Sequence, residues 1–134
     1  MSYTIVKRTP TVKDYNDVRL RAGLTAKDEL AAQKGLANTL FAACIVHDGG
    51  VVGIGRVIGD GGLVYDIVDV AVVAEHQGRG VGNMIMETLM SYIDANARTS
   101  SIVCLMANKG IASFYEKYGF KVREPDMPGM ILRK

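Results

Sequence analysis

The sequence predicts an α+β fold with a mixed, mainly antiparallel twisted sheet, a central parallel β-α-β crossover and flanking helices. Two Asp-Gly-Gly turns, at 48–50 and 60–62, separate three apolar segments, as expected for consecutive antiparallel strands. A long helical pattern then precedes another apolar run, and a helix between two strands of one sheet joins them in parallel. No internal repeat, linker or low-complexity segment interrupts residues 1–134, which predicts a single domain.

The N-terminal quarter predicts a short strand and two helices. Residues 3–7 alternate weakly, as a strand does. Thr11 and Asp14 resemble a capping box for a first helix, and Gly23 suits its end. Thr25 and Asp28 repeat the capping signal for a second helix, expected over roughly 26–38.

The middle of the chain predicts the sheet and its crossover helix. Strands are predicted over residues 41–47, 51–59 and 63–73. The helix that follows runs from about Gly80 to Asn96, and its polar positions form one narrow stripe, so most of its circumference should be buried. Residues 101–107 are almost continuously apolar, which suggests a strand buried on both faces.

The C-terminal part predicts a short helix and two last strands. Asn108 is expected to cap the helix, and Gly119 to end it. The strands are expected in FKVRE and GMILRK, around a loop that contains Pro125 and Pro128.

Composition narrows the class of protein. Hydrophobic residues make up 49% and charged residues 22%, as in a globular protein with a core. The net charge of +2 comes from scattered basic residues, whereas a nucleic-acid-binding surface needs clustered ones. No apolar run is long enough to span a membrane and the N-terminus lacks a signal peptide, so we expect a cytoplasmic protein without nucleic-acid or membrane partners. Cys44 and Cys104 lie in apolar runs and are read as buried thiols, with a disulfide as the alternative.

A glycine-rich loop, QGRGVG at 77–82, joins the third strand of the meander to the long helix. Such a loop presents free N–H groups and the positive end of the helix dipole, which suits a phosphate group. A tight turn without a ligand is the alternative. The dinucleotide fingerprint G-x-G-x-x-G fails because Asn83 stands where the third glycine belongs, and the Gly-Lys-Ser/Thr ending of a P-loop is absent.

VAV at 70–72 followed by QGRGVG resembles the coenzyme A-binding motif of the GNAT superfamily of N-acetyltransferases, in which Gln or Arg precedes two spaced glycines. NKGIASFYEKYGF at 108–120 resembles the family's second segment, with its Asn, its Tyr on a short helix and its closing Gly-Phe. The order of strands and helices matches over essentially the whole chain. DVAVVAEHQGRGVG especially resembles the glucosamine-phosphate N-acetyltransferase branch, although the substrate does not follow from that.

The resemblance implies that the protein binds acetyl-CoA through backbone groups. The loop amides would hold the pyrophosphate, Arg79 could add a charge-assisted bond, and the strand at 70–72 would accept the pantetheine arm where the central strands splay apart. Asn108 would hydrogen-bond the pantetheine, and a solvated surface position is the alternative for Arg79. The cofactor-binding residues implied are Val70, Val72, Gln77, Gly78, Arg79, Gly80, Val81, Gly82, Asn83, Asn108 and Tyr115.

The resemblance also implies the chemistry. Tyr115 matches the family tyrosine that protonates or hydrogen-bonds the departing thiolate, and a core tyrosine is the alternative. Asp66 and Asp69 interrupt an apolar strand, where desolvation should raise the pKa of a carboxyl group and suit it to act as a base. Asp66 is favoured as the base and Asp69 as structural, because Asp66 shares strand parity with Val70; a bulge would invalidate that argument. Pairing of either Asp with Arg56, or proton transfer through water, are the alternatives.

The amine acceptor is expected between the first two helices and the C-terminal hairpin. The residues indicated are Arg19, Arg21, Leu24, Phe41, Arg56 and the loop 126–129. Arg19 and Arg21 would favour an acidic acceptor or be merely solvated. His47 and His76 lack metal-like spacing and are interpreted as surface residues, so no metal is expected.

The function predicted is therefore N-acetyltransfer from acetyl-CoA to a primary amine of a small molecule or peptide. A non-catalytic CoA-binding sensor or interaction domain is the rival from another class. Exposed edge strands and the apolar tail GMILRK predict a homodimer, as the GNAT resemblance also implies.

Overall fold

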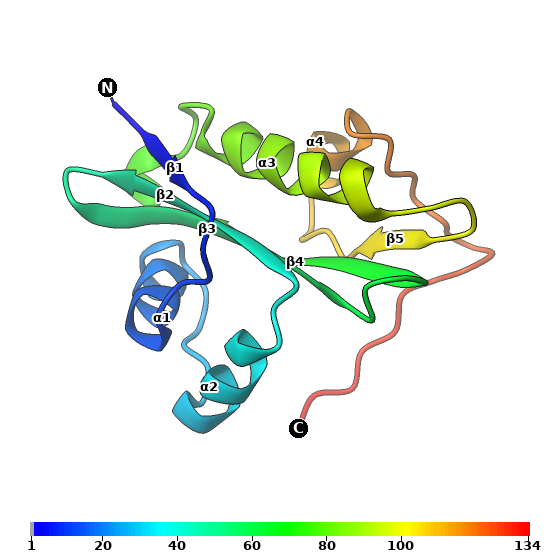
Figure 1. Ribbon diagram of the computed structural model, residues 1–134, viewed down its shortest axis with the longest axis horizontal. Helices are drawn as coiled ribbons and strands as arrows, with labels where there is room; N and C mark the ends of the chain where they lie inside the picture. Colours follow the sequence, from blue (N-terminus) through cyan, green and yellow to red (C-terminus); the bar gives the residue numbers. More distant parts are fainter. Residues whose placement is uncertain (1) are drawn as a thin grey trace.

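The computed structural model describes residues 2–134 and has an α+β architecture built on one five-stranded sheet (Figure 1). The strands lie in the order β1-β2-β3-β4-β5, and every neighbouring pair is antiparallel except β4 and β5, which are parallel. The strands are β1 (Thr4–Val6), β2 (Phe41–His47), β3 (Gly50–Gly59), β4 (Val64–Val72) and β5 (Ile102–Leu105). The predicted meander and the predicted parallel crossover are confirmed.

Helices cover both faces of the sheet. They are α1 (Val12–Arg21), α2 (Glu29–Ala37), α3 (Val81–Asn96) and α4 (Ala112–Glu116), with a 3-10 turn at Ala74–His76. Figure 1 shows α1 and α2 on one face, and α3 and α4 on the other. The α1 N-cap is Thr11, which accepts a hydrogen bond from the Asp14 N–H, and Asp28 caps α2 through the Ala31 N–H. The second helix is therefore shorter at its start than expected, because Asp28 rather than Thr25 is its cap.

Helix α3 forms the main hydrophobic layer against the sheet. Its buried side chains are Val81, Ile85, Met86, Thr88, Leu89 and Ile93, while Glu87, Ser91 and Asp94 stay exposed, as the polar stripe predicts. Two glycines of β3 let the helix approach closely: a Cβ on Gly53 would lie 2.9 Å from Val81 Cγ1, and one on Gly55 2.5 Å from Ile85 Cγ2. This close approach fixes the start of α3, and the glycine loop before it, relative to the sheet.

Three predictions about the C-terminal third are wrong. Residues 120–134 form no strand, because a strand needs a hydrogen-bonding partner and local apolar content alone does not supply one. Strand β5 is consequently an edge strand with alternating exposure, not a strand buried on both faces. Cys104 lies on that strand and is exposed, whereas Cys44 is buried as predicted; both are free thiols.

Candidate active site

The site lies where β4 and β5 diverge. Their parallel pairing covers only Val64–Ile67 against Ile102–Leu105, although β4 continues to Val72 along β3. The β4 backbone beyond Ile67 therefore presents peptide groups that no β5 residue pairs with. An extended ligand could bind there as an additional strand.

A β-bulge in β4 turns Asp69 toward α1. The register shifts between Ile54 and Arg56 of β3, and Asp69 has a positive φ of 57°. Tyr65 packs against Tyr92 of α3, and Val70 faces α3 beside Ile85 and Leu89. Asp66, next to Tyr65 on an unbulged stretch, therefore points away from α3 and lies on the opposite face from Val70. The parity argument for Asp66 is wrong, because the bulge adds one residue between the two positions.

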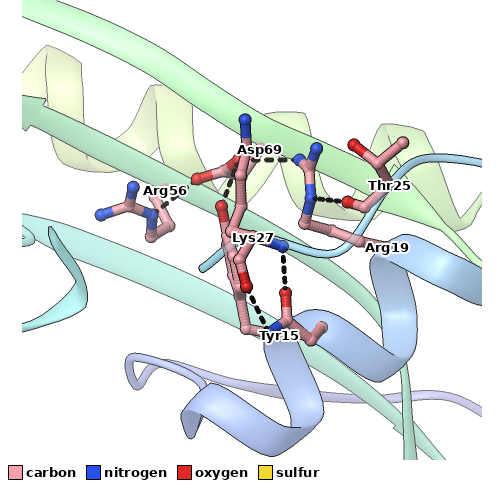
Figure 2. A network of polar contacts seen from close by, with 7 residues as sticks. Tyr15, Arg19, Thr25, Lys27, Arg56 and Asp69 are labelled. Atoms are coloured by element: carbon pink, nitrogen blue, oxygen red, sulfur yellow. Dashed lines mark hydrogen bonds and ion pairs between the residues drawn. The ribbon is translucent and has the colours of Figure 1, made fainter. Parts of the chain in front are cut away.

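Asp69 is the centre of a buried polar network (Figure 2). Its Oδ1 accepts hydrogen bonds from Tyr15 Oη at 2.9 Å and Arg19 Nη1 at 3.3 Å, and its Oδ2 accepts one from Arg56 Nε at 2.8 Å. Its side chain is only 11% exposed. Burial, and then the neighbouring carboxylate, raise the pKa of Tyr15 to about 12, so the phenol stays protonated and donates. Because both carboxylate oxygens are engaged, Asp69 holds the three side chains in place around it.

A cavity of about 490 Å³ opens at the diverging strands, within the usual size of a small-molecule site. Its walls come from β4, the end of β5, α4, and α1 with the loop after it. They are formed by Arg19, Gly23, Leu24, Thr25, Lys27, Ile67, Val68, Asp69, Val70, Leu105, Met106, Asn108, Tyr115 and Arg133. The cavity is therefore lined by six of the residues expected from sequence: Arg19, Leu24, Asp69, Val70, Asn108 and Tyr115.

Tyr115 lines this cavity from α4. The residue is 8% exposed, and its hydroxyl makes no hydrogen bond within residues 2–134. No fully buried side-chain oxygen or nitrogen in that range lacks a partner, so the hydroxyl is not fully buried, and Tyr115 is one of the residues that line the cavity. Burial raises the pKa of this phenol, which favours its neutral, proton-donating form.

The glycine loop begins α3 in a conformation that suits glycine. Gly78 and Gly80 have positive φ angles of 74° and 84°, and no atom lies within 4 Å of a Cβ added to either. Gly80 is the N-cap without a side-chain cap, so the first N–H groups of α3, at Val81, Gly82 and Asn83, have no acceptor within the helix. These amides and the helix dipole form a cradle that fits a pyrophosphate.

Helix α4 packs against the first turn of α3. A Cβ on Gly82 would lie 3.3 Å from Phe114 Cζ, and Tyr118 Oη donates to Asn83 Oδ1 at 2.6 Å. The glycine at 82 therefore permits close packing of α4, which carries Tyr115. Gln77 donates from Nε2 to the carbonyl oxygen of Val72 at 2.9 Å, which fixes the end of β4 to the loop.

Other expected site residues lie outside the cavity. Arg21 is exposed and pairs with Asp17 on its own helix, and Phe41 stacks on Tyr92 at a ring distance of 4.7 Å on the α3 face. Arg56 reaches the network around Asp69 and lines a smaller neighbouring pocket of about 150 Å³. Asp66 does not line the cavity; burial raises the pKa of its carboxyl group, and a hydrogen bond with Cys104 opposes that rise.

The structure also changes the interpretation of Asn108 and of the two histidines. Asn108 is not the N-cap of α4, because the helix begins at Ala112, so that alternative to a ligand contact falls away. His47 and His76 are half-buried, with ring centroids 4.9 Å apart, and Tyr3 Oη lies 2.8 Å from His76 Nδ1.

Among residues 2–134 no group of three or more His, Cys, Asp or Glu side chains could hold a metal ion. No helix in the same range is long and apolar enough to cross a membrane.

Sequence reasoning missed Tyr15, Lys27 and Arg133. Tyr15 looks like an ordinary apolar-face residue of a helix, and Lys27 and Arg133 look like solvated charges. No local signal marks any of them. Only the packing of α1 against β4, and the position of Arg133 in the cavity wall with Leu105 and Met106, bring them to the site.

Comparisons with known proteins agree with this geometry. The acetyltransferase (GNAT) domain family matches residues 33–122. The crystal structure of a probable acetyltransferase of unknown function from meticillin-resistant Staphylococcus aureus is similar to this one. That protein is 40% identical, with a TM-score of 0.94 over 99% of this chain and 100% of that one. An uncharacterized N-acetyltransferase, ycf52, of Porphyra purpurea is 36% identical over 76 residues, which cover 57% of this chain and only 42% of that relative.

The finer resemblance to the glucosamine-phosphate branch is not specific. Glucosamine-6-phosphate N-acetyltransferase from Arabidopsis thaliana superposes with a TM-score of 0.67 over 95% of this chain and 98% of that one, but at 19% identity. That likeness extends to the fold alone. The matched domain, the diverging strands and the glycine cradle together establish that this chain belongs to the GNAT acetyltransferase family.

Proposed function

We propose that this chain is an N-acetyltransferase that transfers the acetyl group of acetyl-CoA to a primary amine of a small molecule or peptide. The observation that carries the proposal is the cavity at the diverging β4 and β5 strands, which Tyr115 lines, together with the glycine cradle at the start of α3. Acetyl-CoA, when bound, supplies the activated thioester. Family membership supports its use as the co-substrate.

Different residues of the chain bind different parts of acetyl-CoA. The amides at 81–83 bind the pyrophosphate, and the free edge of β4 beyond Ile67 pairs with the pantetheine arm, as Asn108 does through its side-chain amide. This positioning directs the thioester into the cavity. Backbone groups are suited to the task because they are rigid and already desolvated on one side.

In the proposed reaction, the amine nitrogen attacks the thioester carbonyl carbon, a C–N bond forms and the C–S bond breaks. The Tyr115 hydroxyl donates its proton to the departing sulfur, and water in the cavity takes the proton lost by the amine and restores that of Tyr115. Water is the proposed acceptor because both oxygens of Asp69, the one carboxylate of the cavity wall, already accept hydrogen bonds. Asp69 acts here as a positioning residue.

Two measurements test the proposal. Calorimetry should find saturable binding of acetyl-CoA, and a thiol-release assay with a panel of amines and peptides should find turnover that depends on the acceptor. Intact acetyl-CoA binding with silence across a broad panel would favour the rival function, a CoA-binding sensor. Undetectable acetyl-CoA binding at high concentration would contradict both.

The two carboxylates should behave differently when each is replaced by its amide. Asp69→Asn should lower turnover, with a larger effect on acceptor KM than on acetyl-CoA affinity, because Arg19, Arg56 and Tyr15 lose their common partner. Asp66→Asn should leave turnover nearly unchanged, because Asp66 lies outside the cavity wall. Steady-state kinetics on both variants, with circular dichroism as the folding control, decide between them. A loss of turnover only in Asp66→Asn would restore Asp66 as the base.

A homodimer is part of the same proposal. Segment 120–134 exposes large apolar side chains, and so does the β5 edge beside it. They are Val122, Met127, Met130, Ile131 and Leu132 in the segment, and Ile102 and Met106 at the edge. A second copy of this chain would cover them through a self-complementary contact. Sedimentation should give about twice the 14.5 kDa chain mass, and Met130→Glu with Leu132→Glu should shift it toward 14.5 kDa; a wild-type mass of 14.5 kDa would contradict the dimer.

A further inference from the structure

The charged part of the cavity wall is dominated by cations. Arg19, Lys27 and Arg133 line it together with Asp69. The negative charge of Asp69 is already offset by Arg19 and Arg56, which both bind it. Lys27 and Arg133 therefore add positive charge that no carboxylate of the wall balances. Such a cavity attracts an anion and repels a second positive charge on an acceptor.

Arg19 keeps one guanidinium nitrogen available to a ligand. Its Nε donates to the Thr25 carbonyl oxygen at 2.8 Å and its Nη1 to Asp69, whereas Nη2 makes no hydrogen bond within residues 2–134. Arg19 is only 9% exposed, and no fully buried polar side-chain atom in that range lacks a partner. The Nη2 group is therefore not fully buried, and Arg19 is one of the residues that line the cavity.

The loop that carries Lys27 is held in a fixed position. The Asn16 side chain binds both backbone groups of Lys27: its Oδ1 accepts from the Lys27 N–H at 2.8 Å, and its Nδ2 donates to the Lys27 carbonyl oxygen at 3.1 Å. The bond from Arg19 to Thr25 ties the same loop to α1 a second time. Figure 2 shows Lys27 and the bond from Arg19 to Thr25 beside the Asp69 network. The guanidinium group of Arg19 and the backbone of Lys27 are thus held in place before any ligand arrives, which lowers the entropic cost of binding.

These cations are distinct from the cradle for the pyrophosphate. Arg19 and Lys27 belong to α1 and the loop after it, on one face of the sheet, while the glycine loop starts α3 on the other face (Figure 1). A phosphate bound at the start of α3 would leave them unsatisfied. Their ligand must come from the acceptor.

Resting on the proposed function, we infer that the amine acceptor carries an anionic group, a carboxylate or a phosphate, which binds the Nη2 group of Arg19 and the ammonium group of Lys27. The anion anchors the acceptor on the α1 side of the cavity. Its amine then extends toward Tyr115, on the opposite wall. A charge-assisted contact of this kind also discriminates strongly against uncharged analogues.

Matched pairs of acceptors test the inference by calorimetry on the protein saturated with CoA, which requires no turnover. The pairs are O-phosphoethanolamine with ethanolamine, glucosamine 6-phosphate with glucosamine, and glutamate with its dimethyl ester. At least one anionic member should bind about tenfold or more tightly than its uncharged partner. The phosphate and carboxylate pairs distinguish the two sources of charge. Equal or tighter binding of the uncharged members, or no binding by any anionic member, would overturn the inference.

A charge variant distinguishes a direct contact between Lys27 and the anionic group from the general attraction of a positively charged surface. Lys27→Gln should weaken binding of the preferred anionic amine about tenfold or more, and leave acetyl-CoA affinity unchanged. Lys13→Gln, which removes an exposed cation from α1 outside the cavity, is the matched control and should have little effect. Equal effects of the two substitutions would overturn the inference. If uncharged amines are acetylated and the anionic members of the pairs show no tighter binding, the inference about the anionic group is wrong, while the proposed acetyltransferase function stands.

Discussion

Replacing Tyr115 with phenylalanine is expected to lower turnover by about two to four orders of magnitude, the usual contribution of a general acid. Tyr115 lines the cavity and its hydroxyl has no hydrogen-bond partner within residues 2–134, so its loss removes the proposed proton donor for the departing thiolate. The ring remains, and its burial among core residues should keep the free energy of unfolding close to that of the wild type. Acetyl-CoA affinity should change little, because backbone groups provide most of that binding.

Steady-state kinetics on the Tyr115→Phe variant measure its turnover, and calorimetry on the same variant measures its acetyl-CoA affinity. Tyr92→Phe is the control, because Tyr92 stacks on Phe41 outside the cavity. Burial raises the pKa of Tyr115 above its ordinary value of 10.0, so the phenol should remain a proton donor up to that pH. The wild-type rate should therefore fall on the alkaline side only above about pH 10. Activity of Tyr115→Phe equal to the wild type would assign the proton to water instead.

Gly80→Asp is expected to weaken acetyl-CoA binding about 100-fold or more, through repulsion between the new carboxylate and the pyrophosphate. Gly80 is the N-cap of α3 and has a positive φ of 84°, a conformation that Asn and Asp tolerate better than other residues. A Cβ there meets no atom within 4 Å, so the substitution adds charge without a clash. The free energy of unfolding should fall by no more than about 1–2 kcal/mol, the cost of a left-handed backbone for an L residue, because Asp is among the residues that tolerate it best and its charge suits a helix N-terminus.

Gly80→Asn is the matched control, since it has the same shape and the same backbone preference without the charge. The difference in affinity between the two variants should shrink in high salt, as an electrostatic effect does. Equal affinities would contradict binding of the pyrophosphate at this loop. Gly82→Val should also lose acetyl-CoA binding, but it presses on Phe114, so its effect combines ligand contact with displacement of α4.

Local signals in the sequence were sufficient for most of the elements. The Asp-Gly-Gly turns, the N-caps at Thr11 and Asp28, and the polar stripe of α3 each depend on residues a few positions apart. Backbone preference and short-range hydrogen bonds decide such features, and a sequence displays them directly. The glycine loop belongs to the same class, because positive φ angles at Gly78 and Gly80 are a property of the residues themselves.

Only the tertiary structure decided the orientation of the carboxylates and the walls of the cavity. No glycine in β4 marks the position of the bulge at Asp69. The bulge arises where β4 pairs with β3, and hydrogen bonds from Tyr15 of α1 and Arg56 of β3 hold the Asp69 side chain. Residues 120–134 have the apolar content of strands but no partner to pair with, so they remain irregular. Lys27 becomes part of the site because Asn16, eleven residues earlier, holds its backbone. The sequence by itself thus determined most of the elements and the cradle. Long-range pairing and packing determined which charges line the cavity, because those contacts join residues with no local relation in the chain.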